Sequence, residues 1–128
     1  MINIDKENVL TSTGVWATYE GSEFLVAHTS HLPFQRAVMR RQQPHRKKIE
    51  NGTLDPETLR DLMCQSMAEA LILDWKKVTD GEGKEVPYSP ASGYKALKNN
   101  PDLRDFISEF SMNLENFRQL EKEALGKD

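Results

Sequence analysis

Few side chains in this 128-residue chain stand at the spacings that enzymatic chemistry requires. The single cysteine, Cys64, lies inside an apolar helical pattern with no histidine near it in sequence, which favours a small buried hydrophobe over a nucleophile. His28 and His31 are three residues apart, but the second pair of ligands that a zinc site needs does not accompany them. These residues therefore predict neither a catalytic nucleophile nor a metal site.

Phosphate and calcium binding find no better support in the sequence. Residues 80–85 read DGEGKE, which resembles the start of an acidic calcium loop, but Ala91 occupies the twelfth position, where such a loop needs an acid. Neither GxxxxGK[ST] nor GxGxxG occurs in the chain. We therefore expect a polar turn at residues 80–85, and a protein that is not an enzyme and binds no cofactor.

Basic side chains are concentrated between residues 36 and 48, where no acid interrupts them. Such a segment could bind nucleic-acid phosphates, with an affinity that falls steeply with salt. However, the pI of the chain is 5.6, far below the value above about 9 that is typical of dedicated binders, and no aromatic residues interleave the basic ones. We expect a protein-facing or solvated surface, with a small nucleic-acid-binding regulatory protein as the alternative. The basic residues are Arg36, Arg40, Arg41, Arg46, Lys47 and Lys48.

Length and charge are those of one soluble domain. Residues 1–48 hold seven Lys and Arg against four Asp and Glu, a net charge of +3, so the remaining 80 residues carry −6. Such an uneven distribution suits contact between copies or with a charged partner. The lone cysteine, the missing secretion signal and the lack of a long apolar run predict a cytoplasmic protein.

A β-hairpin is expected near the N-terminus. Two β-prone runs, Val15–Tyr19 and Glu23–His28, are separated by Glu20-Gly21-Ser22, and a glycine in a short polar connection is a hairpin signal. An isolated two-stranded ribbon is marginal in water. The hairpin should therefore pack against a helix or pair with another chain.

Helices are expected over most of the remaining chain. Pro33 fits the first turn of a helix that should break at Pro44 and end at Gly52. Asp55 is a suitable cap for a long helix from Pro56 to Lys77, whose apolar face includes Trp75 as a core anchor. Two short helices should begin at Pro90 and Pro101, which follow the capping residues Ser89 and Asn100. The last of these is expected to run to about Leu120.

The apolar surface of Phe106, Phe110 and Phe117, together with Met63, Met67 and Met112, is larger than two short neighbouring helices need. We therefore expect part of it to contact another chain, together with the arginines of the first helix. The candidate interface residues are Arg36, Arg40, Arg41, Phe106, Phe110 and Phe117. The fold class expected is mainly α (α+β): one helical domain over residues 1–128 with an N-terminal β-hairpin and flexible ends at 1–12 and 121–128.

The order of these segments resembles a known family. The matching features are Leu73-Asp74-Trp75 followed by Val78, the turn Asp80–Gly83, and Pro87-Tyr88-Ser89-Pro90. The aromatic-rich stretch from Asp102 to Phe117 also matches, as do the early Trp16, the FLVAH run, and Phe34 followed by basic residues. On these features the chain resembles the tail assembly chaperones of long-tailed (siphovirus, lambdoid-type) bacteriophages.

The resemblance implies a function in viral tail morphogenesis. A protein of this family keeps the tape measure protein soluble while tail tube subunits polymerise around it, acts in the host cell cytoplasm, and is absent from the mature virion. It would assemble with itself into a ring or spiral homo-oligomer. A longer product, made by programmed frameshifting near the end of the reading frame, would contact the tail tube protein. Gly126-Lys127 can be encoded within a slippery heptamer, which places the expected frameshift there.

Overall fold

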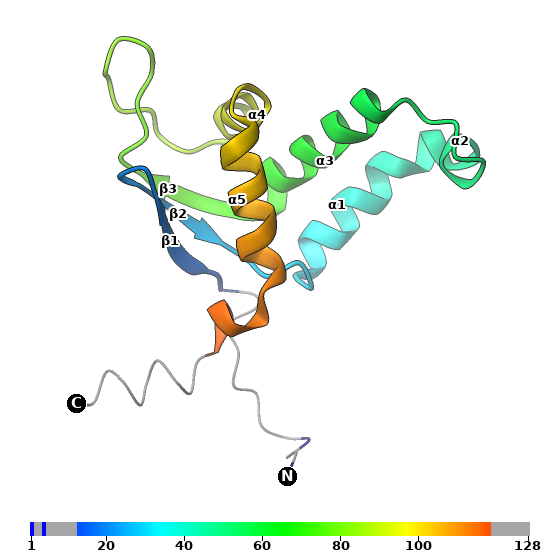
Figure 1. The fold of residues 1–128 in the computed structure, drawn as a ribbon, viewed down its shortest axis with the longest axis horizontal. Coiled ribbons are helices and arrows are strands. Elements are labelled where there is room, and N and C mark those ends of the chain that lie inside the picture. Colours follow the sequence, from blue (N-terminus) through cyan, green and yellow to red (C-terminus); the bar gives the residue numbers. More distant parts are fainter. Residues whose placement is uncertain (2–3, 5–12, 119–128) are drawn as a thin grey trace.

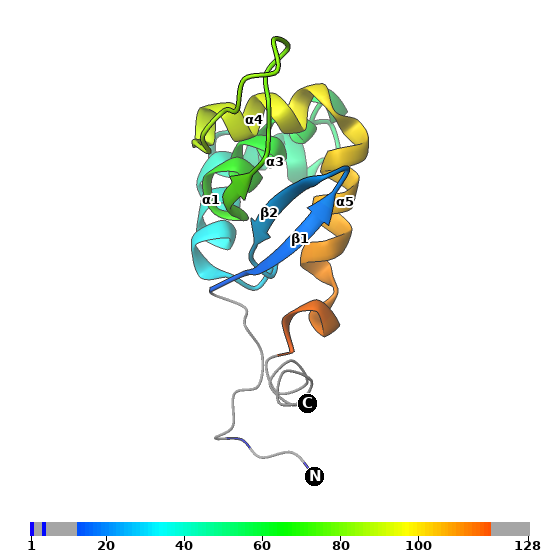
Figure 2. The same ribbon diagram turned by 90° about the vertical axis from the view of Figure 1, so that its left-hand side faces the viewer.

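The computed structural model describes Met1, Ile4 and residues 13–118 of the chain (Figure 1). It shows an α+β domain in which helices cover one face of a three-stranded antiparallel sheet (Figure 2). This confirms the expected class, a helical domain with an N-terminal β-hairpin. The expected flexible ends, 1–12 and 121–128, lie outside the described residues except for Met1 and Ile4.

The hairpin consists of β1 (Val15–Tyr19) and β2 (Ser22–Val26), joined by a two-residue turn. Glu20 has φ 48° and Gly21 has φ 81°, so both central residues adopt the left-handed conformation that this tight hairpin turn needs. The turn is one residue shorter than expected because Ser22 already pairs with Tyr19. The predicted ribbon is therefore confirmed, with a slightly different boundary.

The long helix predicted from Pro56 to Lys77 is wrong in its last third. Helix α3 (Pro56–Ala70) ends before β3 (Ile72–Lys76), which pairs antiparallel with β2. The isoleucine and tryptophan of this segment suit a strand as well as a helix face, and the hairpin lacked a third strand. Pairing across 50 residues of chain therefore decided the local structure, and Trp75 packs edge-on against Phe24 with ring centroids 6.2 Å apart.

The first helix breaks as predicted. Helix α1 (Leu32–Gln42) has its proline in the first turn, and Pro44 lies in the 3₁₀ helix η1 (Gln43–His45) that leads into α2 (Arg46–Glu50). α1 packs along α3, and together with α2 they form a helical arm that extends away from the sheet (Figure 1). The predicted cap of α3 is confirmed, since Asp55 Oδ2 accepts from the Thr58 N–H at 3.1 Å.

Two short helices close the domain. Helix α4 (Pro90–Asn99) starts with a capping box between Ser89 and Ser92, and α5 (Pro101–Met112) follows directly. The prediction that the last helix continues to Leu120 is wrong, because the backbone becomes extended at Asn113 and restarts as the 3₁₀ helix η2 (Leu114–Phe117). The Asn113 side chain accepts from the Glu115 N–H and so caps η2. Leu120 itself lies outside the described residues.

The core lies between the sheet and helices α3, α4 and α5. Trp75 is only 5% exposed, which confirms it as a core residue, and its indole N–H donates to the Val86 carbonyl at 2.7 Å. The core also includes Phe24, Val26, Met67, Leu71, Ile72, Leu97, Leu103 and Ile107. Within the described part of the chain, no helix is both long enough and apolar enough to span a membrane.

Candidate functional site

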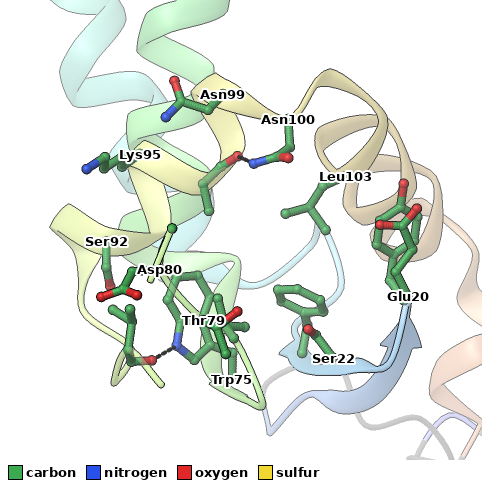
Figure 3. Close-up of a pocket in the computed structure, with 16 residues that line it drawn as sticks. Glu20, Ser22, Trp75, Thr79, Asp80, Ser92, Lys95, Asn99, Asn100 and Leu103 are labelled. Carbon is green, nitrogen blue, oxygen red and sulfur yellow. Dashed lines mark hydrogen bonds between the residues drawn. The ribbon is translucent and has the colours of Figure 1, made fainter. Parts of the chain in front are cut away.

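A pocket of about 670 Å³ opens between the turn of the hairpin, residues 78–86 and helices α4 and α5 (Figure 3). The nearly buried rings of Phe24 and Trp75, together with Leu103, line its inner wall. Glu20, Asp80, Ser92, Lys95, Asn99 and Asn100 contribute its polar lining. The pocket therefore combines an apolar wall with a mixed polar rim.

The acidic side chain of Asp80 in this pocket serves the local fold. Asp80 Oδ1 accepts from the N–H groups of Glu82 at 2.9 Å and Lys84 at 3.0 Å, so it closes its own turn. The Val86 N–H donates to the Val78 carbonyl at 2.8 Å and makes the segment a tight hairpin, as the predicted polar turn requires. The carboxylate of Asp80 is thus a structural group of the loop.

Cys64 and His28 occupy structural positions. Cys64 is 2% exposed, and this burial raises the pKa of its thiol although Arg104 opposes the shift. His28 Nδ1 hydrogen-bonds to Ser30, and its ring stands edge-on against Phe117 at 5.3 Å. Among the residues that the structure describes, no group of three or more His, Cys, Asp or Glu could hold a metal ion.

The basic segment is partly neutralised within the protomer. Arg40 and Arg41 both bind Glu69 of α3, at 2.6 and 2.7 Å, and these hydrogen bonds hold the pKa of the Glu69 carboxyl below its usual value. Arg46 pairs with Glu50 at 3.2 Å. Glu69 lies 28 residues or more from its partners in the chain, so this pairing is not apparent from the sequence. Three of the six basic residues are therefore paired with acids of the same chain.

The three phenylalanines of the predicted interface form one row. Phe106 contacts Phe110 at 6.0 Å between ring centroids, Phe110 contacts Phe117 at 5.8 Å, and Tyr19 of β1 joins the row through Phe106 at 4.9 Å. We call these four residues the aromatic row. Phe117 is fully buried, whereas the other three are partly exposed. Only part of the row is therefore available for contact with another chain.

The structure does not join the arginines and phenylalanines into one site. Arg36, Arg40 and Arg41 lie on α1, whereas the phenylalanines lie on α5 and η2, and these elements stand on opposite sides of the domain (Figure 2). Arg36 is exposed on the helical arm. The six predicted residues thus define two separate surfaces, and whether either contacts another chain stays a prediction.

The fold defines a small α+β protein. The family model described as YdaY prophage protein matches residues 28–128, and the chain belongs to this family. No curated protein and no solved structure matches the chain. The expected bacteriophage origin is therefore confirmed, and the match covers every helix of the domain together with β3.

Proposed function

We propose that this protein is a non-enzymatic phage tail assembly chaperone, which keeps the tape measure protein soluble while tail tube subunits polymerise. The observation that carries the proposal is the match to a prophage protein family over residues 28–128. The same part of the chain contains most of the segments that resemble tail assembly chaperones. Such a protein works in the host cell cytoplasm as a ring or spiral homo-oligomer and is absent from the mature virion.

The helical arm supports this proposal because it exposes apolar side chains. Met39 of α1 is 68% exposed, and Leu59 of α3 is 39% exposed, so the apolar stripe of α3 is incompletely covered by α1. Tape measure proteins are long and helical, and an unshielded apolar seam would aggregate. Methionine adapts to varied partners, and a surface between two helices can receive an amphipathic helix. The helical arm therefore exposes apolar surface of the kind that could bind the apolar seam of a tape measure protein.

The alternative, a regulator that binds nucleic acid through Arg36–Lys48, has weaker support. Three of its six basic side chains, Arg40, Arg41 and Arg46, already pair with acids of the same protomer. Each paired arginine would have to exchange a carboxylate for a phosphate, which reduces the net gain from counterion release. Contact with protein accounts better for this arm.

Co-expression with the tape measure protein of the same phage tests the proposal. The tape measure protein should move from the insoluble to the soluble fraction when this chain is present, and the two should purify together. Met39→Asp should weaken this effect, because it puts a charge on the exposed surface of the arm. Met112→Asp is the matched control, since Met112 is similarly exposed, at 61%, on α5.

Two results would contradict the proposal. One is a tape measure protein whose solubility is the same with and without this chain. The other is retention of this chain by nucleic acid but not by the tape measure protein, which would favour the alternative.

A further inference from the structure

The two edges of the sheet differ in how they are protected. An edge strand presents unpaired backbone groups, which proteins usually flank with charge, bend away or cover. β3 carries the charged side chain of Asp74, whose carboxylate accepts the Trp75 N–H at 2.8 Å. Lys77 then takes φ 60° and turns the chain out of the strand. The edge at β3 is therefore closed to a further strand.

β1 itself carries no charged side chain, and no described residue covers its outer backbone groups. Its sequence, VWATY, contains no charge and no proline, and β1 is the outer strand of the sheet (Figures 1 and 2). A two-residue turn makes Tyr19–Ser22 the closing hydrogen-bonded pair, and because such pairs alternate, Trp16 and Thr18 direct their N–H and C=O groups away from β2. Among the described residues, these backbone groups have no hydrogen-bond partner outside the hairpin. Both residues are exposed.

Partly exposed apolar side chains flank this open edge. Tyr19 lies at the end of β1, and Phe106 and Phe110 continue the aromatic row along α5, which packs against β1. Trp16 is 39% exposed on the other face of the sheet, where the Lys76 ammonium lies 4.3 Å from its ring centroid. A strand added at β1 would thus bury apolar surface on both faces as well as satisfy backbone groups.

We propose that β1 pairs antiparallel with β1 of a second copy of this chain, so that two sheets join into one. A two-fold axis at Ala17 places Trp16 of one copy opposite Thr18 of the other, which pairs all the outward backbone groups of both residues. No like charges meet in this register, because the strand has none. The inference deepens the proposed function, on which it rests for the need to self-associate, and it gives one interface of that assembly.

The test compares three forms of the full chain by gel filtration with light scattering over a concentration series. Thr18→Pro removes an outward N–H at an edge position, where proline is tolerated, and Thr18→Ala keeps that N–H. The wild type and Thr18→Ala should associate, and Thr18→Pro should raise the dissociation constant of the dimer at least tenfold. Circular dichroism and melting temperature verify that each variant is folded.

Hydrogen exchange of the wild type tests the same edge without a substitution. The amides of Trp16 and Thr18 should lose protection on dilution, whereas the Ala17 amide, which faces β2, should keep it. A wild type that stays monomeric throughout, or a folded Thr18→Pro that associates normally, overturns the proposal. Protection of both amides in the monomer would also overturn it, because a segment of the same chain would then cover the edge.

These outcomes are separable from the chaperone proposal. If β1 pairing fails while the chain still solubilises the tape measure protein, the assignment of this edge is wrong and the function stands. If the wild type dimerises through β1 but leaves the tape measure protein insoluble, the interface stands and the function is wrong.

Discussion

At the scale of single residues, Gly93 shows how a close contact overrides a local preference. It lies inside α4, where alanine would ordinarily stabilise a helix by about 1 kcal/mol relative to glycine. A Cβ atom at this position would lie 2.8 Å from the ring of Tyr88. The ring cannot easily retreat, since its hydroxyl donates to the Ala68 carbonyl and it packs edge-to-face with Trp75 at 4.9 Å between centroids.

We therefore expect Gly93→Ala to lower the melting temperature. Gly81→Ala is the matched control, because nothing lies within 4 Å of a Cβ atom there, and it should change stability little. Thermal unfolding followed by circular dichroism measures both variants. A Gly93→Ala protein at least as stable as the wild type would show that Tyr88 is free to move.

Trp75 is a second residue whose substitution should strongly change the stability of the protein. It is 5% exposed, contacts Phe24 and Tyr88, and donates a buried hydrogen bond. Trp75→Ala should lower the free energy of unfolding by about 3–5 kcal/mol, the usual range for a large aromatic side chain in a core. Trp75→Phe keeps a ring but loses the N–H, so it should cost less. Urea unfolding measures both, and a loss below 1 kcal/mol for the alanine variant would contradict the assignment to the core.

At the scale of elements, α1 is joined to α3 by charge as well as by apolar packing. Arg40 and Arg41 share Glu69, and the ion pairs are partly exposed, so each should contribute no more than about 1 kcal/mol. Arg41→Glu should therefore destabilise the arm modestly by placing two carboxylates together. The double variant Arg41→Glu, Glu69→Arg should recover part of the loss, and a double-mutant cycle in urea measures the coupling. Strictly additive single effects would contradict the pairing.

The same pair has a defined pH dependence. The pKa of Glu69 is lowered in the folded protein, so the stability it contributes is present above its unfolded pKa and is lost as pH falls through the folded pKa. The difference in stability between wild type and Glu69→Gln should therefore shrink in acid. Unfolding curves of the wild type and of Glu69→Gln at neutral and acid pH measure this difference.

Elements encoded locally were predictable, and those set by distant partners were not. The hairpin, the break at Pro44 and the cap at Asp55 follow from neighbouring residues, and the structure confirms them. β3 was missed because its strand form depends on pairing with β2, about 50 residues earlier. The prediction that Trp75 lies in the core was nevertheless correct, because a buried residue fits the apolar pattern of a helix as well as that of a strand. Glu69 was missed for the same reason as β3: its partners are distant in sequence.

At the scale of the whole molecule, the sequence predicted which residues belong to the candidate surfaces but not how these surfaces are arranged in space. The sequence indicated more apolar surface at Phe106 and Phe110 than the core can bury. It did not indicate that these residues lie beside Tyr19. It also gave no sign that the arginines and the aromatic row would lie on opposite sides (Figure 2). The arrangement of these surfaces therefore depends on tertiary contacts between segments whose individual composition was clear.

A whole-molecule prediction concerns a longer product of the gene. We expect translation to shift by −1 near codons 125–127, at Gly126-Lys127, and to continue into an extension that contacts the tail tube protein. These residues lie outside the described part of the chain. The nucleotide sequence and mass spectrometry of the expressed proteins test this directly. A gene without a slippery run there, or without an open −1 frame beyond it, would remove the prediction for this protein.

The central claim is that this protein acts on the tape measure protein during tail assembly and then leaves. Quantitative mass spectrometry of an induced phage lysate, separated into assembly intermediates and finished particles, measures this most directly. The account predicts that the protein is found with the tape measure protein in intermediates that lack a complete tube, and that it is absent from finished virions. Its presence in finished virions in amounts comparable to a tail subunit, or its absence from every fraction that contains the tape measure protein, would contradict the account.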